Sequence, residues 1–418
     1  MLKNLIQFTK KNKLFIIIFL AFLLSRFYVL KFPPPHYSDV SHDYERYANM
    51  WWYGLPPYLK HYYEYPPATI PLLLFPLWLD LSGVGSYYTN YRVQIFVFEI
   101  FLFLIILKIL KKIKTRPLSK YLAAIFYILI GMVAKDFWYE GLDLVFIGFY
   151  VIALAAWFLE KKYKLGSRIL SWFFFWLSTA IKFMSGPLAL PFLASQKEKL
   201  KKNLIAAFIG FLLVWGLPLA IFRSSLSVSL VFHLNRGAKY ASFPSFIIEA
   251  VNQFTNSESR LDQPPDFQFV GPVSDLILKI FTPIFFLGVL GVVIFAFLKI
   301  LKSSKKGKNL GRLLKYSLIY IFTIFLTGKV FSSPFHIWTV PLITIFPFKN
   351  VKNQLLVLAF VSYLVIVDTT PWIRLPDTAL IGPLSLGTIF NASRFAVIGF
   401  LLAWFAKDRA SENIRSRG

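Results

Sequence analysis

The apolar positions of this chain fall in long runs that short basic clusters and polar segments separate. A membrane-spanning helix needs about 20 predominantly apolar residues. The runs predict about twelve spans, near residues 14–30, 92–110, 120–135, 142–159, 169–182, 184–196, 203–222, 276–299, 315–329, 335–348, 354–370 and 393–406. We therefore expect an all-α, polytopic membrane helix bundle whose two ends lie on the same side.

Three apolar segments need separate treatment. Residues 66–81 are rich in proline, and a full crossing there would place the basic residues 111–116 outside, so we expect an interfacial or re-entrant outer segment. Gly186 and Pro187 interrupt the stretch 169–196, which predicts a hairpin that does not fully reach the outer surface. No small-residue cleavage site follows the first span, so we expect a retained anchor.

Composition agrees with a membrane protein and excludes other classes. Of the 418 residues, 57% are hydrophobic and 19% aromatic, whereas soluble domains have about 45–50% apolar residues. There is no cysteine, which excludes a disulfide scaffold and a thiolate nucleophile. We expect one integral-membrane domain, 1–418, with a long, partly helical first outer loop at 31–91 and a second outer loop at 223–275.

In a soluble protein, a formal net charge of +26 would indicate nucleic-acid binding. Here 31 of the 46 Lys and Arg residues lie in seven stretches that the positive-inside rule places in the cytoplasm: 3–13, 108–120, 160–168, 197–202, 299–315, 349–352 and 407–417. We therefore expect a multi-pass cell-membrane protein with both termini cytoplasmic, in contact with membrane lipid and with no nucleic-acid partner.

Acidic residues follow the opposite distribution, because 14 of the 20 lie in or beside the segments that alternate with the basic stretches. The first outer loop holds four of them just after the first span: Asp39, Asp43, Glu45 and Glu64. A positioned carboxylate can take the proton of an attacking hydroxyl. The loop is also rich in Trp and Tyr, which fits either stacking on sugar rings or the ordinary aromatic belt of a membrane interface.

The order of residues in this loop resembles a known family. The sequence has Ser38-Asp39-Val40, then Tyr47, Gly54, Pro57-Tyr58 and Glu64-Tyr65-Pro66-Pro67. Three later segments add to the resemblance: Ala180-Ile181-Lys182 with Pro187, Phe232-His233-Leu234-Asn235-Arg236-Gly237, and Gly328-Lys329-Val330-Phe331-Ser332 continuing to Pro341-Leu342. Together they resemble the polyprenol-phosphate-mannose-dependent mannosyltransferases, glycosyltransferase family 87, of the GT-C superfold.

The resemblance implies a GT-C-like bundle that works as an inverting hexosyltransferase. Such an enzyme moves a sugar, typically mannose in this family, from a polyprenyl or dolichyl phosphate to a hydroxyl of a glycan or glycolipid acceptor on the outer face. The base would be Asp39, in the Ser-Asp-Val context, or Asp43, which keeps the family's spacing to Tyr47. The donor phosphate would meet Lys182, Lys329 and Arg236. Substrate contacts would come from Tyr47, Tyr58, Glu64, Tyr65, His233 and His336.

The late segment departs from the family pattern, since Ser333 precedes Pro334 and Phe335-His336 replaces the usual Gln-Tyr. Other basic residues inside or at the edge of apolar runs are Arg26, Arg92 and Arg394. These either snorkel to the interface or pair with outer carboxylates.

No histidine shows metal-ligand spacing and no nucleotide-binding glycine loop occurs. We predict no cofactor and no metal ligands, and leave a divalent-metal requirement open.

A multi-span transporter or lipid flippase is the alternative function. It would explain the number of spans and the lysines in apolar helices. It predicts paired halves and charges near the bilayer midplane, whereas this sequence has no internal repeat and clusters its acids after the first span.

Overall fold

Long apolar helices make up most of the computed structural model, which describes residues 2–32, 38–160, 164–255, 260–261, 268–303, 310–369, 380–381 and 384–408. Seven of its helical segments are long and apolar enough to cross a membrane: Leu14–Lys31, Tyr87–Lys112, Lys197–Asn235, Pro272–Leu301, Leu310–Thr327, Val351–Thr369 and Ile389–Lys407. The chain is therefore an α-helical membrane protein, as the apolar runs predict.

The first half of the chain is helical from the first span to the second outer loop. Its elements are α1 (Leu2–Lys31), the π-helical turn η1 (Val40–Tyr44), α2 (Glu45–Trp52), α3 (Thr69–Leu81), α4 (Tyr87–Lys112), α5 (Pro117–Val133), α6 (Lys135–Trp138), α7 (Asp143–Leu159), α8 (Leu165–Ile181), η2 (Phe183–Leu188), α9 (Ala189–Ala194), η3 (Lys197–Lys199), α10 (Leu200–Phe222), η4 (Arg223–Leu226) and α11 (Ser227–Asn235).

The second half adds the helices that cover the other side of the bundle, together with a few two- and three-residue strands. These elements are β1 (Ala238–Lys239), α12 (Phe243–Thr255), β2 (Arg260–Leu261), β3 (Gln268–Val270), α13 (Pro272–Leu301), α14 (Leu310–Thr327), η5 (Ser333–Trp338), α15 (Val340–Thr344), α16 (Val351–Thr369), β4 (Leu380–Ile381), β5 (Leu384–Ser385) and α17 (Leu386–Lys407). β3 pairs antiparallel with β1 and β2, so one small sheet joins the start and end of the second outer loop.

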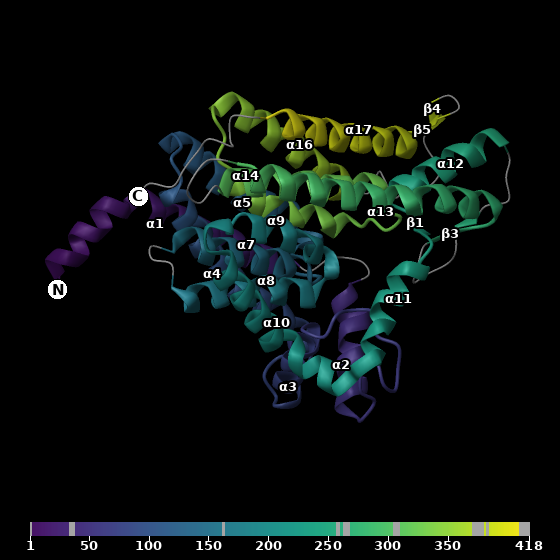
Figure 1. The fold of residues 1–418 in the computed structure, drawn as a ribbon, viewed down its shortest axis with the longest axis horizontal. Coiled ribbons are helices and arrows are strands. Elements are labelled where there is room, and N and C mark those ends of the chain that lie inside the picture. The colour runs from purple at the N-terminus through teal and green to yellow at the C-terminus, as the bar shows by residue number, and fades with distance from the viewer. Residues whose placement is uncertain are drawn as a thin grey trace.

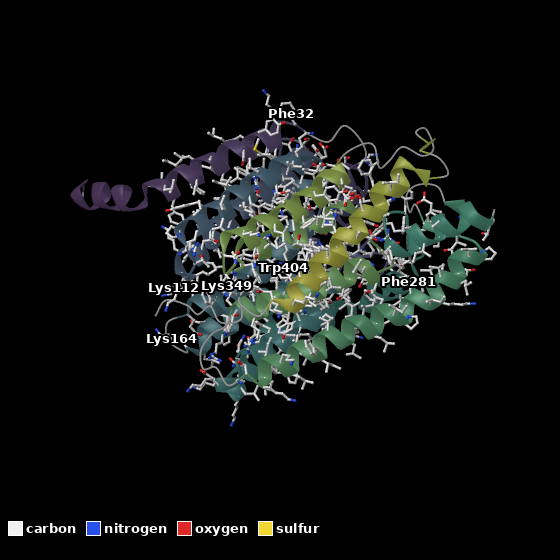
Figure 2. The ribbon with its side chains drawn as sticks, turned by 90° about the horizontal axis from the view of Figure 1, so that it is seen from above. Phe32, Lys112, Lys164, Phe281, Lys349 and Trp404 are labelled. Carbon is white, nitrogen blue, oxygen red and sulfur yellow. The ribbon has the colours of Figure 1, made fainter. Side chains whose placement is uncertain are left out.

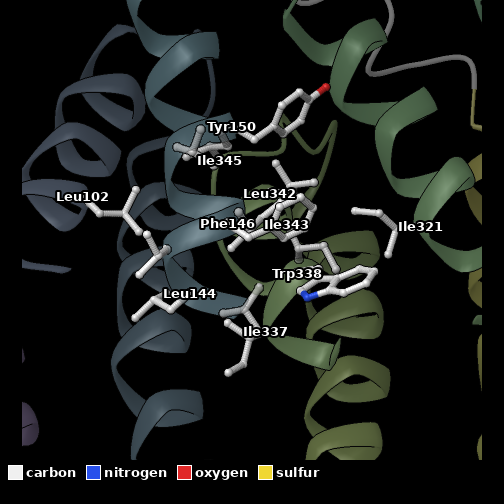
Figure 3. Close-up of a cluster of buried hydrophobic side chains, with 14 of the residues drawn as sticks. Leu102, Leu144, Phe146, Tyr150, Ile321, Ile337, Trp338, Leu342, Ile343 and Ile345 are labelled. Atoms are coloured by element: carbon white, nitrogen blue, oxygen red, sulfur yellow. The ribbon is translucent and has the colours of Figure 1, made fainter. Parts of the chain in front are cut away.

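The centre of the bundle is formed by α7, α14 and the segment η5–α15. Figure 3 shows Phe146 of α7 close to Ile343 and Trp338, with the ring of Tyr150 from the same helix extending toward α14, and all four side chains are buried. Ile321 of α14 closes this group from the other side. Around this centre, α13, α14, α16 and α17 run along the long axis, and α10, α3 and α2 lie on the opposite flank (Figure 1).

Each of the twelve predicted spans falls on a helix, but not every helix is a full crossing. The predicted span 184–196 is the short pair η2–α9, and the predicted span 335–348 is the short pair η5–α15. Proline and glycine at 186–187 and proline at 334 and 341 explain why these stretches break into single turns. Twelve complete crossings are therefore not confirmed. The segment 66–81 contains a 13-residue helix, α3.

Basic residues gather at one end of the bundle. Figure 2 shows Lys112, Lys164 and Lys349 at the same end of the long axis, with Phe281 of α13 toward the other end. The end of α17 lies beside the start of α14, because Lys315 Nζ donates to the carbonyl of Asp408 at 2.6 Å. Residues of three predicted basic stretches, 108–120, 160–168 and 349–352, therefore lie at one end of the bundle.

The two long outer loops meet each other. Tyr62 lies against Phe232 of α11 with ring centroids 5.3 Å apart, and Tyr58 lies 5.0 Å from Phe222 at the end of α10. Residues 256–259 and 262–267 of the second loop lie outside the described residues.

Candidate functional site

Asp39 stands where the first outer loop re-enters the bundle, directly before the π-turn η1. Such turns occur often at functional sites. The side chain is partly buried, and this burial raises the pKa of Asp39 to about 6. Lys239 acts in the opposite direction, and the negative charges of Asp43, Glu64 and Asp143 add to the rise. Asp39 is thus a carboxylate whose proton affinity suits a base near neutral pH.

Glu64 and Arg236 bring the two outer loops together at this point. Arg236 Nη1 lies 3.9 Å from Glu64 Oε2, and both side chains are largely buried. Burial raises the pKa of Glu64, while Arg236 and Lys239 act in the opposite direction. The distance places the pair at the outer limit of an ion pair.

Lys239 lies close to Asp39, Glu64 and Arg236, and no sequence motif singles it out. It lies in β1, three residues after Arg236, and its backbone N–H donates to the carbonyl of Lys329 at 2.8 Å. Burial lowers the pKa of Lys239, and so does the charge of Arg236, while Asp39 and Glu64 act in the opposite direction. The only signal in the sequence is a second cation shortly after Arg236 in the second outer loop.

The two predicted lysines also reach this region. Lys329 follows α14, and its Nζ donates to the carbonyl of Leu234 at 2.6 Å. Lys182 follows α8 and pairs with Asp143, with 2.5 Å between Nζ and Oδ1. Lys182 lies within electrostatic range of both Lys239 and His233, and Lys329 lies within range of His233.

Seven ionisable side chains from both outer loops, from the start of α7 and from the ends of α8 and α14 therefore converge. We call them the mixed-charge cluster: Asp39, Glu64, Asp143, Lys182, Arg236, Lys239 and Lys329. Each lies outside or at the terminus of its helix, so the cluster forms where the helices end.

Asp143 and Trp338 hold Lys182 on its inner side. The indole N–H of Trp338 donates to Asp143 Oδ1 at 2.5 Å. The Lys182 ammonium lies 5.0 Å from the ring centre of Phe335 and 5.5 Å from that of Trp338, which is the range of cation–π attraction. The residues Phe335 and Trp338, in a segment that departs from the family pattern, therefore contact a predicted site lysine.

Asp43, the other candidate base, has a different environment. Its carboxylate accepts a hydrogen bond from Arg46 at 3.1 Å, and the Arg46 side chain is 60% exposed. Surface pairs of this kind contribute little. Of the two candidate bases, Asp39 is the one whose pKa burial raises, so we take it as the candidate base.

The predicted aromatic residues divide into two groups. Tyr47 stacks on Trp51 and His61, with ring centres 6.2 and 5.7 Å apart, and burial raises its pKa to about 12. Tyr58 has a positive φ of 64°, and its buried hydroxyl donates to the carbonyl of Tyr65. Tyr58 therefore fixes the loop that carries Glu64 and Tyr65, and its hydroxyl is committed to this contact.

The two predicted histidines lie in different places. His233 is on α11 beside Arg236, within range of Lys182 and Lys329. His336 is buried, with its Nε2 2.5 Å from Asp368, which also pairs with Arg394 at 2.8 Å. His336 thus belongs to a separate buried network and the structure does not bring it together with Asp39.

The three arginines singled out inside the predicted spans are each paired with a carboxylate, although Glu99, the partner of Arg26, lies inside a predicted span and is not an outer carboxylate. Arg26 pairs with Glu99 at 2.9 Å, Arg92 with Glu140 at 3.0 Å, and Arg394 with Asp368. Within the described residues, no group of three or more His, Asp or Glu side chains is arranged to hold a metal ion.

Comparison with family models and with curated proteins finds no match for this chain. The chemical argument therefore rests on the cluster itself. It combines a carboxylate of raised pKa with four cations, which can accept a proton at one point and stabilise an anion at another.

Proposed function

We propose that the protein is a membrane glycosyltransferase that moves a sugar, mannose in the family it resembles, from a polyprenyl or dolichyl phosphate to a hydroxyl of a glycan or glycolipid on the outer face. The observation that carries this proposal is the convergence of Asp39 with Lys182, Arg236, Lys239 and Lys329. A base and an anion-binding group are the two parts that such a transfer requires.

The reaction is written as one displacement. Asp39 takes the proton of the acceptor hydroxyl while the acceptor oxygen forms a bond to the anomeric carbon of the sugar. The bond from that carbon to the phosphate oxygen breaks on the opposite face, and the electron pair leaves with the lipid phosphate. The configuration at the anomeric carbon inverts, and the cations of the cluster stabilise the charge that develops on the phosphate.

Formal charges support this assignment. The cluster has four cations and three carboxylates, so it carries one excess positive charge. A lipid-phosphate sugar is a phosphodiester with one negative charge. After transfer, Asp39 is neutral and the lipid monophosphate has gained one negative charge. The total is zero before and after the reaction, so no net charge is left buried at either stage.

The position of the cluster supports a transferase over the alternative of a transporter or flippase. A carrier needs its charged groups along a path through the bundle. Here the cluster lies at helix ends, shortly after α1 (Leu2–Lys31), α8 (Leu165–Ile181), α11 (Ser227–Asn235) and α14 (Leu310–Thr327) end. The charged pairs inside the helices, such as Arg26–Glu99, are already satisfied by each other.

Purified protein in liposomes should be tested with a panel of labelled polyprenyl-phosphate sugars and, as matched controls, the corresponding nucleotide sugars. Transfer of label from a lipid-phosphate sugar to a glycan or glycolipid acceptor, with inversion at the anomeric carbon, is the expected result. Transfer only from nucleotide sugars would contradict the proposal. Movement of the intact lipid across the bilayer without transfer would support the flippase.

A further inference from the structure

Ser38 connects Asp39 to a buried carboxylate on the other side of the chain. The Ser38 hydroxyl donates to Glu140 Oε2 at 2.5 Å and accepts the backbone N–H of Val40 at 3.2 Å. The carbonyl of Ser38 also accepts the N–H of His42 at 3.1 Å. One serine therefore fixes both the start of the turn η1 and its distance from Glu140, with Asp39 held between these contacts.

Glu140 is itself held from a third segment. Tyr88 of α4 donates its hydroxyl to Glu140 Oε1 at 2.9 Å, and Arg92 Nε lies 3.0 Å from the same oxygen. The remaining nitrogens of Arg92 donate to the carbonyls of Val29 and Leu30 at the end of α1, at 2.8 and 3.1 Å. Arg92 and Glu140 thus bind the chain on both sides of the segment 33–37, at the end of α1 and at Ser38.

Asp39 needs such a restraint because of its charged neighbours. Its carboxylate faces Asp43 from its own turn, Glu64 from the first outer loop and Asp143 from α7, with Lys239 from β1 as the opposing cation. Three like charges favour rotation of the ionised carboxylate toward water. A general base must stay within hydrogen-bond reach of its proton, and a displacement of about 1 Å can lower a rate by roughly 100-fold.

We propose that Glu140 is a positioning residue for Asp39 and acts through the hydroxyl of Ser38. This inference rests on the proposed function, in which Asp39 is the base. Glu140 meets the turn through Ser38, and the proton transfer itself is left to Asp39. The role is therefore geometric: removing the hydroxyl should release the turn without removing the base.

A double-mutant cycle tests the proposal. Ser38→Ala should lower kcat about tenfold with the KM for the donor within about twofold, and Ser38→Thr, which keeps the hydroxyl, should restore most of the rate. In an Asp39→Asn background, Ser38→Ala should cause no further loss, because a positioning group has nothing left to position. An equal loss in both backgrounds, or no loss in either, would overturn the proposal.

Ser171→Ala is the matched control, since it also removes one buried hydroxyl, which donates to the carbonyl of Ala153 on α7. It should leave kcat near that of the wild type.

A second measurement separates this inference from the proposed function. The chain has no native cysteine, so a spin label at Ser41→Cys, an exposed position in η1, reports the turn alone. Ser38→Ala and Glu140→Gln should both increase the mobility of the label, whether or not the donor panel gives transfer. An unchanged spectrum would show that Glu140 does not hold the turn, and absence of transfer with a mobile label would count against the proposed function only.

Discussion

Two groups of buried charged side chains in this protein, the Arg26–Glu99 pair and the mixed-charge cluster, differ in how their charges are compensated. Arg26 and Glu99 are fully buried, and their polar atoms are satisfied. The guanidinium donates to both Glu99 oxygens and to the carbonyls of Tyr127 and Ile128. Glu99 also accepts from Trp138 at 3.1 Å and from the hydroxyl of Tyr139.

The mixed-charge cluster has the opposite character. Its central pair, Arg236 and Glu64, is 3.9 Å apart, and the pKa of Asp39 is raised to about 6 because burial is incompletely compensated. A network whose polar atoms are all paired stabilises one packing arrangement, whereas carboxylates of perturbed pKa are found preferentially at functional sites. The comparison indicates a structural role for the Arg26–Glu99 pair and agrees with the catalytic role that we propose for the mixed-charge cluster.

Even the backbone reflects this difference. A side chain at Gly131 of α5 would collide with the guanidinium of Arg26, so the helices are shaped around that pair. The cluster, by contrast, is assembled from loops and helix ends.

The largest expected effect is on catalysis. Asp39→Asn should lower turnover about 10²–10⁴-fold, because a general base typically contributes that much, and donor binding should persist. Asp43→Asn is the matched control and should leave turnover within about twofold, since Asp43 pairs with an exposed arginine. The measurement is single-turnover transfer of labelled sugar. Loss in the Asp43 variant with a normal Asp39 variant would reverse the assignment.

The next effect is on stability. Glu99→Gln leaves the Arg26 charge buried without its anion, which typically costs about 3–5 kcal/mol. The fraction of folded protein in detergent, followed through thermal or denaturant unfolding, should fall accordingly. If this variant kept the stability of the wild type and lost only transfer, the Arg26–Glu99 pair would belong to the chemistry and the comparison would fail.

A smaller effect is expected for the donor. Lys239→Met removes one cation of the cluster and should weaken binding of the lipid-phosphate sugar by about tenfold or more, because a hydrogen bond to a charged group contributes about 1.5–3 kcal/mol. Acceptor affinity should change less. Lys60→Met, at an exposed lysine of the first outer loop, is the control, and equal weakening in both variants would argue against a defined phosphate site.

The dependence on pH gives a gradual test. Asp39 must be deprotonated to act as a base, so the rate should fall as pH decreases through about 6, approaching tenfold per pH unit, and should level off above it. The residual activity of Asp39→Asn should not show this fall of the rate below pH 6. A limb near pH 4, the ordinary value for a carboxyl group, would show that Asp39 is not the group that titrates.

The helical membrane class and most of the helix positions could be predicted from the sequence. In a bilayer the backbone N–H and C=O groups of a long apolar run must be hydrogen-bonded within the protein, and a helix pairs them within one segment. It placed Lys182 and Lys329 beside breaks in apolar helices, and the structure brings both to the region of Asp39. Lys239 and Asp143 could not be found in this way. Their role depends on which loop ends meet in space, and no periodicity or motif encodes that.

His336 shows a different outcome. The motif order grouped it with the substrate residues, but its partner Asp368 comes from α16, 32 positions later in the chain, and the pair is buried with Arg394. Sequence order alone does not distinguish a basic side chain that binds a ligand from one that contacts a carboxylate of the same chain.

The difference between the two charge groups is tested most directly by the melting temperatures of Asp39→Asn and Glu99→Gln at pH 8. At that pH the native Asp39 is ionised although its folded pKa is raised, so its charge favours the unfolded state and stability is lost as pH rises through 6. Asp39→Asn should therefore melt at or above the temperature of the wild type, and Glu99→Gln well below it. An Asp39→Asn protein that melts as low as Glu99→Gln would contradict the account.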